Sequence, residues 1–204
     1  MTTRTQRVLA AAVMCYSVAF ATAFADDAPR GPGRLTHDAL LEQAKPGSEH
    51  QDLARRVGSW KVTVTMGEGD RAATSSGRVK AHMLMDDRFL WIAYNAAGRA
   101  GSLKGAFMIG FDRRNSRYTI MGIDTHGTYA VTSQGKKDPQ TGTIKLYGKD
   151  DDPHMKAMGF DKEFAHVLDF RGPDEFAIEV RYIDTRTPER REMKAMAFVF
   201  ERNK

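Results

Sequence analysis

Cysteine is nearly absent from this sequence. The only one among 204 residues is Cys15, inside an apolar run near the N-terminus. A chain with one cysteine forms no internal disulfide, and the part after Cys15 offers neither a thiol nucleophile nor a thiolate metal ligand. Its length compensates for this, because a single domain of this size can bury enough apolar surface to be stable without covalent cross-links.

Long apolar runs and basic clusters are also scarce. Apart from residues 8–20, no stretch approaches the ~20 apolar residues that a membrane-spanning helix needs. Lysine and arginine are scattered among acidic residues, although the net charge is +5. Since nucleic-acid binding requires basic residues gathered into a patch or stripe, we expect no nucleic-acid partner, and no stable membrane span once the N-terminal segment is removed.

The motifs of common metal and cofactor sites are missing as well. The sequence has no H-x-H or H-E-x-x-H, no G-x-S-x-G, no phosphate-binding glycine loop and no dinucleotide fingerprint. The acidic run Asp150–His154 lacks the glycine and the spaced acids of a calcium loop. The sequence therefore predicts no metal and no cofactor. Haem is the one alternative, because an inward-facing His166 could ligate it, although a hydrogen-bonded core histidine is the commoner arrangement.

The N-terminus has the three parts of a secretory signal. Arg4 and Arg7 form a basic start, residues 8–20 are apolar apart from one serine, and Ala23–Ala25 is an A-x-A cleavage site. We predict a signal peptide over residues 1–25 and a periplasmic or secreted protein; an uncleaved anchor is the alternative. Cleavage would remove two arginines and no acid, and would lower the net charge from +5 to +3.

The remaining chain is expected to begin with a flexible leader and short helices. Residues 26–35 form the leader, because they contain two prolines and two glycines. A single domain over residues 36–204 then opens with a short helix stopped by Pro46-Gly47. Ser48 and Gln51 have the spacing of a capping box that starts a second helix. One face of that helix, with a period of 3.6 residues, carries His50, Leu53, Ala54 and Val57.

From Trp60 onward, apolar residues alternate with polar ones, which is typical of strands with one solvated face. The alternation and its turn residues predict strands over 60–66, 79–85, 88–96, 102–111, 118–124, 128–133, 143–148, 163–170, 176–184 and 192–202. Regular turns favour an antiparallel arrangement. We predict an all-β fold, a meandering calycin-like barrel of about 8–10 strands with one or two short N-terminal helices. The second helix is placed to cover one open end.

Several of these residues also carry a family resemblance. The pattern P-G-x-E-H-x-x-L followed by G-x-W is matched by Pro46, Gly47, Glu49, His50, Leu53, Gly58 and Trp60. Further matches are D-R-F-L at 87–90, G-F-D at 110–112 with Tyr118 after it, and I-D-T at 123–125. Over residues 46–202 the chain resembles DUF1579, a bacterial family of unknown function. The resemblance implies a barrel of lipocalin type with an interior cavity, and it implies no catalytic residue.

One departure from the family pattern concerns the cavity. The family usually has Trp shortly before the aspartate of I-D-T and Met after it, where this chain has Gly122 and His126. The resemblance therefore implies a cavity that is locally roomier and more polar than in other members.

Asp124 and His126 are the strongest candidates for chemistry. They are two residues apart on a strand and so share a face. A carboxylate that fixes an imidazole tautomer makes a general base, and the pair is a candidate for proton transfer on an organic substrate. A polar strand end facing water is the simpler interpretation.

Three functions remain open at this point. The first is non-catalytic binding of a small apolar or amphipathic molecule inside the barrel, and it is the one we favour. The predicted ligand-binding residues are Trp60, Met83, Trp91, Tyr94, Phe107, Tyr118, Asp124 and His126. The second is an enzyme that uses Asp124 and His126. The third is a structural or interaction domain whose barrel is filled with side chains.

Overall fold

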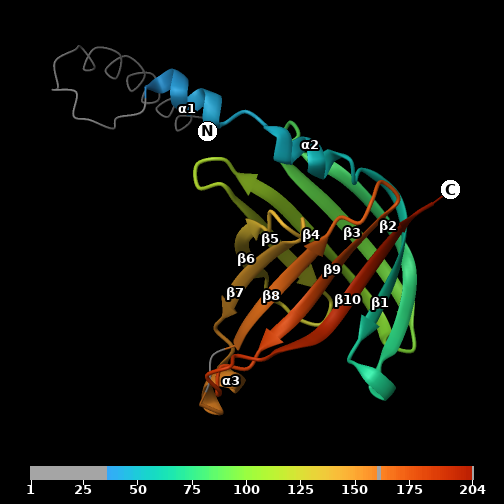
Figure 1. The fold of residues 1–204 in the computed structure, drawn as a ribbon. Helices are drawn as coiled ribbons and strands as arrows, with labels where there is room; N and C mark the ends of the chain where they lie inside the picture. Colours follow the sequence, from blue (N-terminus) through green and yellow to red (C-terminus); the bar gives the residue numbers. More distant parts are fainter. Residues whose placement is uncertain (1–35, 160–161, 204) are drawn as a thin grey trace, which may run out of the picture. The chain divides into compact units, whose positions relative to one another are not determined.

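The computed structural model describes residues 36–159 and 162–203 (Figure 1). The chain divides into two compact units, Met1–His37 and Asp38–Lys204, and of the first only Thr36 and His37 are described. The signal peptide and leader predicted over residues 1–35 lie outside the described residues and stay predictions. In the described part of the chain, no helix has both the length and the apolar character to cross a membrane.

Strands dominate the larger unit. The strands are β1 (Gly58–Met66), β2 (Ala73–Leu84), β3 (Phe89–Gly98), β4 (Gly101–Asp112), β5 (Arg117–Asp124), β6 (Val131–Lys137), β7 (Ile144–Asp150), β8 (Lys162–Asp169), β9 (Glu175–Ile183) and β10 (Glu192–Arg202). The helices are α1 (His37–Gln43), α2 (Ser48–Ala54) and α3 (Pro153–Ala157), with a 3₁₀ turn η1 at Gly69–Arg71.

The ten strands close into a barrel. Each strand pairs antiparallel with the next in sequence, and β1 also pairs with β10, from Trp60 opposite Arg202 to Met66 opposite Met196. In the described part of the chain, closure leaves no unpaired sheet edge for other chains to pair with. The predicted all-β, antiparallel, meandering barrel with short N-terminal helices is confirmed.

Two strands, β2 and β6, differ from the sequence prediction by more than two residues at a boundary. β2 begins at Ala73 rather than Val79, because residues 73–78 are small or polar and carry no apolar alternation, although they continue the register with β1. β6 covers Val131–Lys137 rather than 128–133. Its polar second half is held by pairing with β5 and β7, which sequence periodicity does not reveal.

Helix α3 begins within the acidic run Asp150–His154, and the sequence did not predict it. Asp152 precedes the helix, and its Oδ1 accepts hydrogen bonds from the N–H groups of His154 (3.0 Å) and Met155 (3.2 Å). Pro153 occupies the first helical position, where its fixed backbone angle suits a helix and its missing N–H costs nothing.

Helix α2 covers one end of the barrel (Figure 1). Leu53 is fully buried and belongs to the core, while the ring of His50 contacts Phe111 edge-on, with centroids 6.1 Å apart. The predicted capping box was wrong by one position. Gly47 precedes the helix, and its N–H donates to Nδ1 of His50 at 3.0 Å. His50 therefore has a structural role at this closed end.

The link from α2 to β1 is fixed by two arginines around Trp60. The Trp60 Nε1 donates to the carbonyl of Arg56 at 2.9 Å, and the Arg202 guanidinium lies 4.1 Å from the Trp60 ring centroid. Gly58 joins the two elements at a φ of +135°, which a side chain rarely allows. The first strand is thus anchored to the last at the end that α2 covers.

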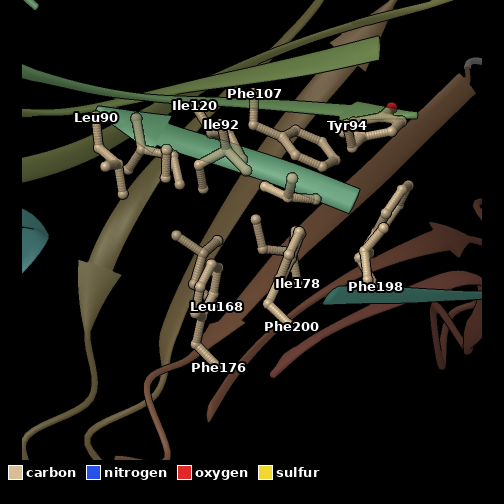
Figure 2. Packing of buried hydrophobic residues seen from close by; sticks show 14 of the residues in the cluster. Leu90, Ile92, Tyr94, Phe107, Ile120, Leu168, Phe176, Ile178, Phe198 and Phe200 are labelled. Carbon is tan, nitrogen blue, oxygen red and sulfur yellow. The ribbon is translucent and has the colours of Figure 1, made fainter. Parts of the chain in front are cut away.

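Apolar side chains fill the middle of the barrel. Figure 2 shows residues of β3–β5, such as Leu90 and Ile120, facing residues of β8–β10, such as Leu168, Ile178 and Phe200. All of these are at most 2% exposed. The barrel is therefore no open tube, and any interior space lies toward its ends.

Candidate functional site: a cavity at the mouth of the barrel

The end of the barrel opposite α2, which we call the mouth, contains a cavity of about 280 Å³. Figure 1 shows α2 and α3 at opposite ends, with α3 at the mouth. The cavity is lined by Met66, Tyr94, Phe107, Gly122, Ile123, Asp124, His126, Gly127, Tyr129, Val131, Lys162, Phe164, His166, Val180, Tyr182, Ala195, Met196 and Phe198. Strands β1, β3–β6 and β8–β10 and the loop after β5 all contribute to this mouth cavity.

Three aromatic rings form one side of the cavity. Tyr94, Phe107 and Phe198 pack together with centroid separations of 5.0–5.4 Å, and Phe107 meets Phe198 edge-on. All three are buried, and they border the packed middle of the barrel (Figure 2). Edge-to-face and tilted aromatic packing of this kind stabilises a rigid apolar surface.

Glycines on neighbouring strands make room for two of these rings. Tyr94 pairs with Gly105, and a Cβ on Gly105 would lie 2.4 Å from the Tyr94 hydroxyl oxygen. Phe107 pairs with Gly122, where a Cβ would lie 3.4 Å from the Phe107 ring. Because each ring lies against a glycine, which has no side chain, the centre of the mouth stays open.

Asp124 and His126 both line the cavity, but they do not form the oriented pair that a general base requires. The Oδ1 of Asp124 accepts a hydrogen bond from the main-chain N–H of His126 at 2.7 Å. This is a turn-forming contact. Among the hydrogen bonds of the described residues, none joins the His126 imidazole to the carboxylate.

Lys162 is a buried cation at the rim with partners of its own. Its Nζ donates to Asp150 at 3.0 Å and to Asp152 at 3.4 Å, and lies 5.2 Å from the centroid of the Tyr129 ring. Burial lowers the pKa of Lys162, but the hydrogen bond to Asp150 and neighbouring groups raise it by more, so the net shift is upward. Lys162 stays charged, and two carboxylates already balance that charge.

His166 lies deepest among the titratable groups of the cavity. It is 1% exposed, its Nδ1 lies 2.8 Å from the hydroxyl oxygen of Ser133, and Phe107 and Phe164 contact the ring edge-on. Burial lowers its pKa to about 4, so the ring is neutral at physiological pH. His166 is thus the hydrogen-bonded core histidine that the sequence favours, and it also borders the cavity.

Tyr94 brings a neutral hydroxyl to the same space. Burial, and then the charge of Asp124, raise the pKa of Tyr94 above its ordinary value. The phenol therefore keeps its proton and can both donate and accept a hydrogen bond.

The sequence-predicted binding residues divide between three places. Tyr94, Phe107, Asp124 and His126 meet at the mouth cavity. Trp60, Met83 and Tyr118 belong to the other end, where burial and the acids Glu49 and Asp52 of α2 raise the pKa of Tyr118 to about 12. Trp91 alternates with the buried Leu90 and Ile92 and lies on the outer face of β3.

The prediction missed most of the mouth on β8–β10 and after β5. Lys162, Phe164, Val180, Tyr182, Met196 and Phe198 line the cavity and were not among the predicted site residues. The order of the elements along the chain could have placed these residues at the mouth. Since α2 leads directly into β1, the mouth lies where β1 ends, and the antiparallel order then assigns one end of every strand to it.

The architecture is an up-and-down barrel closed at one end and hollow at the other, and it can be compared with known proteins. The chain belongs to the family DUF1579, described as a protein of unknown function, whose model matches residues 45–202. No curated protein matches the chain.

Two solved structures are similar to it. Rv2717c from M. tuberculosis is 14% identical, with a TM-score of 0.49 over 78% of this chain and 100% of that one. A de novo designed fluorescence-activating beta barrel is also 14% identical, with a TM-score of 0.40 over 74% of this chain and 98% of that one. At this identity the likeness concerns the fold alone.

Proposed function

We propose that this protein binds a small apolar or amphipathic molecule in the mouth cavity without transforming it. One observation carries the proposal: this hollow combines a rigid aromatic wall with several polar groups, among them Tyr94, Asp124 and His166. Ligand pockets have this composition, with apolar walls and few placed polar groups. The cavity, about 280 Å³, lies just below the typical range of ~300–1,000 Å³, so the ligand would be small.

Binding is favoured over catalysis by the state of the polar groups. One oxygen of the Asp124 carboxylate accepts from the His126 main chain and does not orient the His126 imidazole, and the neutral His166 is held by Ser133. A general base needs an oriented partner and an open path to the proton that it abstracts. The third hypothesis, a structural domain whose barrel is filled with side chains, fits the middle of the barrel but not its mouth.

We also propose that the protein is exported to the periplasm or secreted, on the strength of residues 1–25. N-terminal sequencing of the protein from its own cells should begin at Asp26. A mature chain that retains residues 1–25 would overturn this part of the proposal.

Methionine methyl groups provide a direct test of binding. Met66 and Met196 line the cavity, whereas Met108 and Met121 line an outer groove of the barrel. In protein labelled with ¹³C at methionine methyls, titration with 2-phenylethanol, a neutral amphipathic aromatic, should shift the Met66 and Met196 resonances. Met108 and Met121 serve as the internal control and should not move.

A cavity-filling variant sharpens this test. Gly122→Leu adds a side chain on the inward face, where its Cβ would lie 3.4 Å from the nearest atoms of Phe107 and Val131. The variant should fold and lose the methyl shifts. Gly172→Leu is the matched control, because a Cβ on Gly172 meets no atom within 4 Å. Shifts that persist in Gly122→Leu, or that appear at Met108 instead, would refute binding in the mouth.

A further inference from the structure

Two of the residues that line the mouth cavity carry a formal charge at neutral pH, Asp124 and Lys162. They are not equivalent. Lys162 has a side chain only 10% exposed and is paired with both Asp150 and Asp152. Its positive charge is matched by two negative ones, so it has no net charge left to attract an anionic ligand.

Asp124 is directed into the cavity without a cationic partner. It follows Tyr118, Ile120 and Gly122 on the inward face of β5, two residues after Gly122. Across residues 36–159 and 162–203, no lysine or arginine forms a salt bridge with Asp124. Among the same residues, the one hydrogen bond observed for its side chain comes from the His126 N–H to Oδ1, and an ionised carboxylate accepts several.

The surroundings of this carboxylate favour a cation. The hydroxyl of Tyr94 stays protonated and adds no charge, and the rings of Tyr94, Phe107 and Phe198 present faces and edges to the same space. Aromatic faces attract organic cations within about 6 Å of the ring centroid. An anion would instead meet the unbalanced Asp124 and the carboxylates that hold Lys162.

We propose that the ligand of the mouth cavity carries a protonated amine, which binds the Asp124 carboxylate while its apolar part packs against Phe107 and Phe198. This inference rests on the proposed function, since it assigns a chemical class to the ligand of that same cavity. The amine donates to the open oxygen of Asp124 and lies beside the ring of Tyr94. The ligand class is a small aromatic or aliphatic primary amine.

A pair of matched probes tests the charge. 2-Phenylethylamine is protonated at neutral pH, and 2-phenylethanol has the same shape with a neutral hydroxyl. Titrations followed at the Met66 and Met196 methyls should give a dissociation constant about tenfold lower for the amine. Both probes can donate a hydrogen bond to Asp124, but only the ammonium adds the attraction of a positive charge, and a tenfold difference corresponds to about 1.4 kcal/mol. 3-Phenylpropionate, the anionic counterpart, should bind more weakly than either.

The Asp124→Asn variant should abolish this preference. Its amide oxygen can still accept from the His126 N–H, so the turn is retained. Asp138→Asn is the matched control, because Asp138 makes the same turn contact, Oδ1 to the Gln140 N–H at 2.7 Å, in the hairpin between β6 and β7. The control should keep the tenfold preference.

The outcomes separate the two proposals. If the alcohol and the amine bind with equal affinity to wild type, the amine inference fails and the proposed binding function stands. A preference that survives in Asp124→Asn would also overturn the role of this carboxylate. If neither probe moves the Met66 and Met196 methyls, both the function and the ligand class fail.

Discussion

His166 shows how a single residue links the mouth cavity to the stability of the fold. Its ring is enclosed by Phe107 and Phe164 and bonded to Ser133, and burial lowers its pKa to about 4. An exposed histidine in an unfolded chain has a pKa of about 6.5. Between these two values, the unfolded chain binds more protons than the folded protein.

The stability of the protein should therefore fall as the pH is lowered from about 6.5 to about 4. The pKa difference corresponds to a loss of roughly 3 kcal/mol in the free energy of unfolding. Urea denaturation across this range should show a shallower decline in His166→Gln than in wild type. His50, whose pKa burial also lowers, contributes to the remaining decline.

His82→Gln provides the matched comparison, because His82 is exposed on the outer face of β2. It should follow the wild-type pH profile. Equal slopes for wild type and His166→Gln would mean that His166 is already protonated, or solvated, in the folded state.

At the scale of elements, Arg202 at the end of β10 holds the closed end together. Its guanidinium makes five hydrogen bonds, to Arg55, Val57 and Asp174 and twice to the carbonyl of Pro173. It also stacks on Trp60. One side chain thus joins the last strand to the helix–strand link and to the β8–β9 turn.

Replacing this arginine by lysine should destabilise the closed end. Lysine keeps the charge but lacks the planar fork of donors and the stacking surface. Since each net hydrogen bond contributes about 1 kcal/mol, Arg202→Lys should lower the free energy of unfolding by roughly 2 kcal/mol, measured by urea denaturation.

Glu201→Gln is the neighbouring control. Glu201 and Lys61 are both more than half exposed and 3.9 Å apart, and such pairs contribute about 0–1 kcal/mol. A loss in Arg202→Lys no larger than in Glu201→Gln would contradict the anchoring role of Arg202.

Elements also show which parts of the fold the sequence could predict. Strands such as β1 and β5 alternate clearly, so their inward faces follow from periodicity. Trp91 was misplaced because the run 89–94 is apolar on both faces, which leaves its orientation ambiguous. Helix α3 escaped prediction because its start depends on one capping side chain, Asp152, rather than on an apolar face.

At the scale of the whole molecule, alternation fixes which residues face inward but not how deep they lie. Trp60 and Tyr118 share the inward face with Tyr94 and Asp124, yet they lie at opposite ends of the barrel. Depth follows only from the strand order combined with the position of α2. The packed layer around Leu168 and Ile178 then separates the two ends, so half of the predicted binding residues could not share one site.

Gly122 and His126, where the chain departs from the pattern of the family it resembles, pointed to the position of the cavity. Both residues line the mouth cavity, and the absence of a side chain at Gly122 leaves the space beside Phe107 open. A larger residue at position 122 would occupy the same space, which is why Gly122→Leu separates loss of the cavity from loss of the fold.

The most direct measurement is native mass spectrometry of the protein purified from the cells that produce it. We expect the wild-type protein to carry a small, non-covalently bound organic molecule that is released on collisional activation, and Gly122→Leu to reach the detector as the bare polypeptide. A bare wild-type chain, or the same bound mass on Gly122→Leu, would contradict the claim that the mouth cavity is a ligand-binding site.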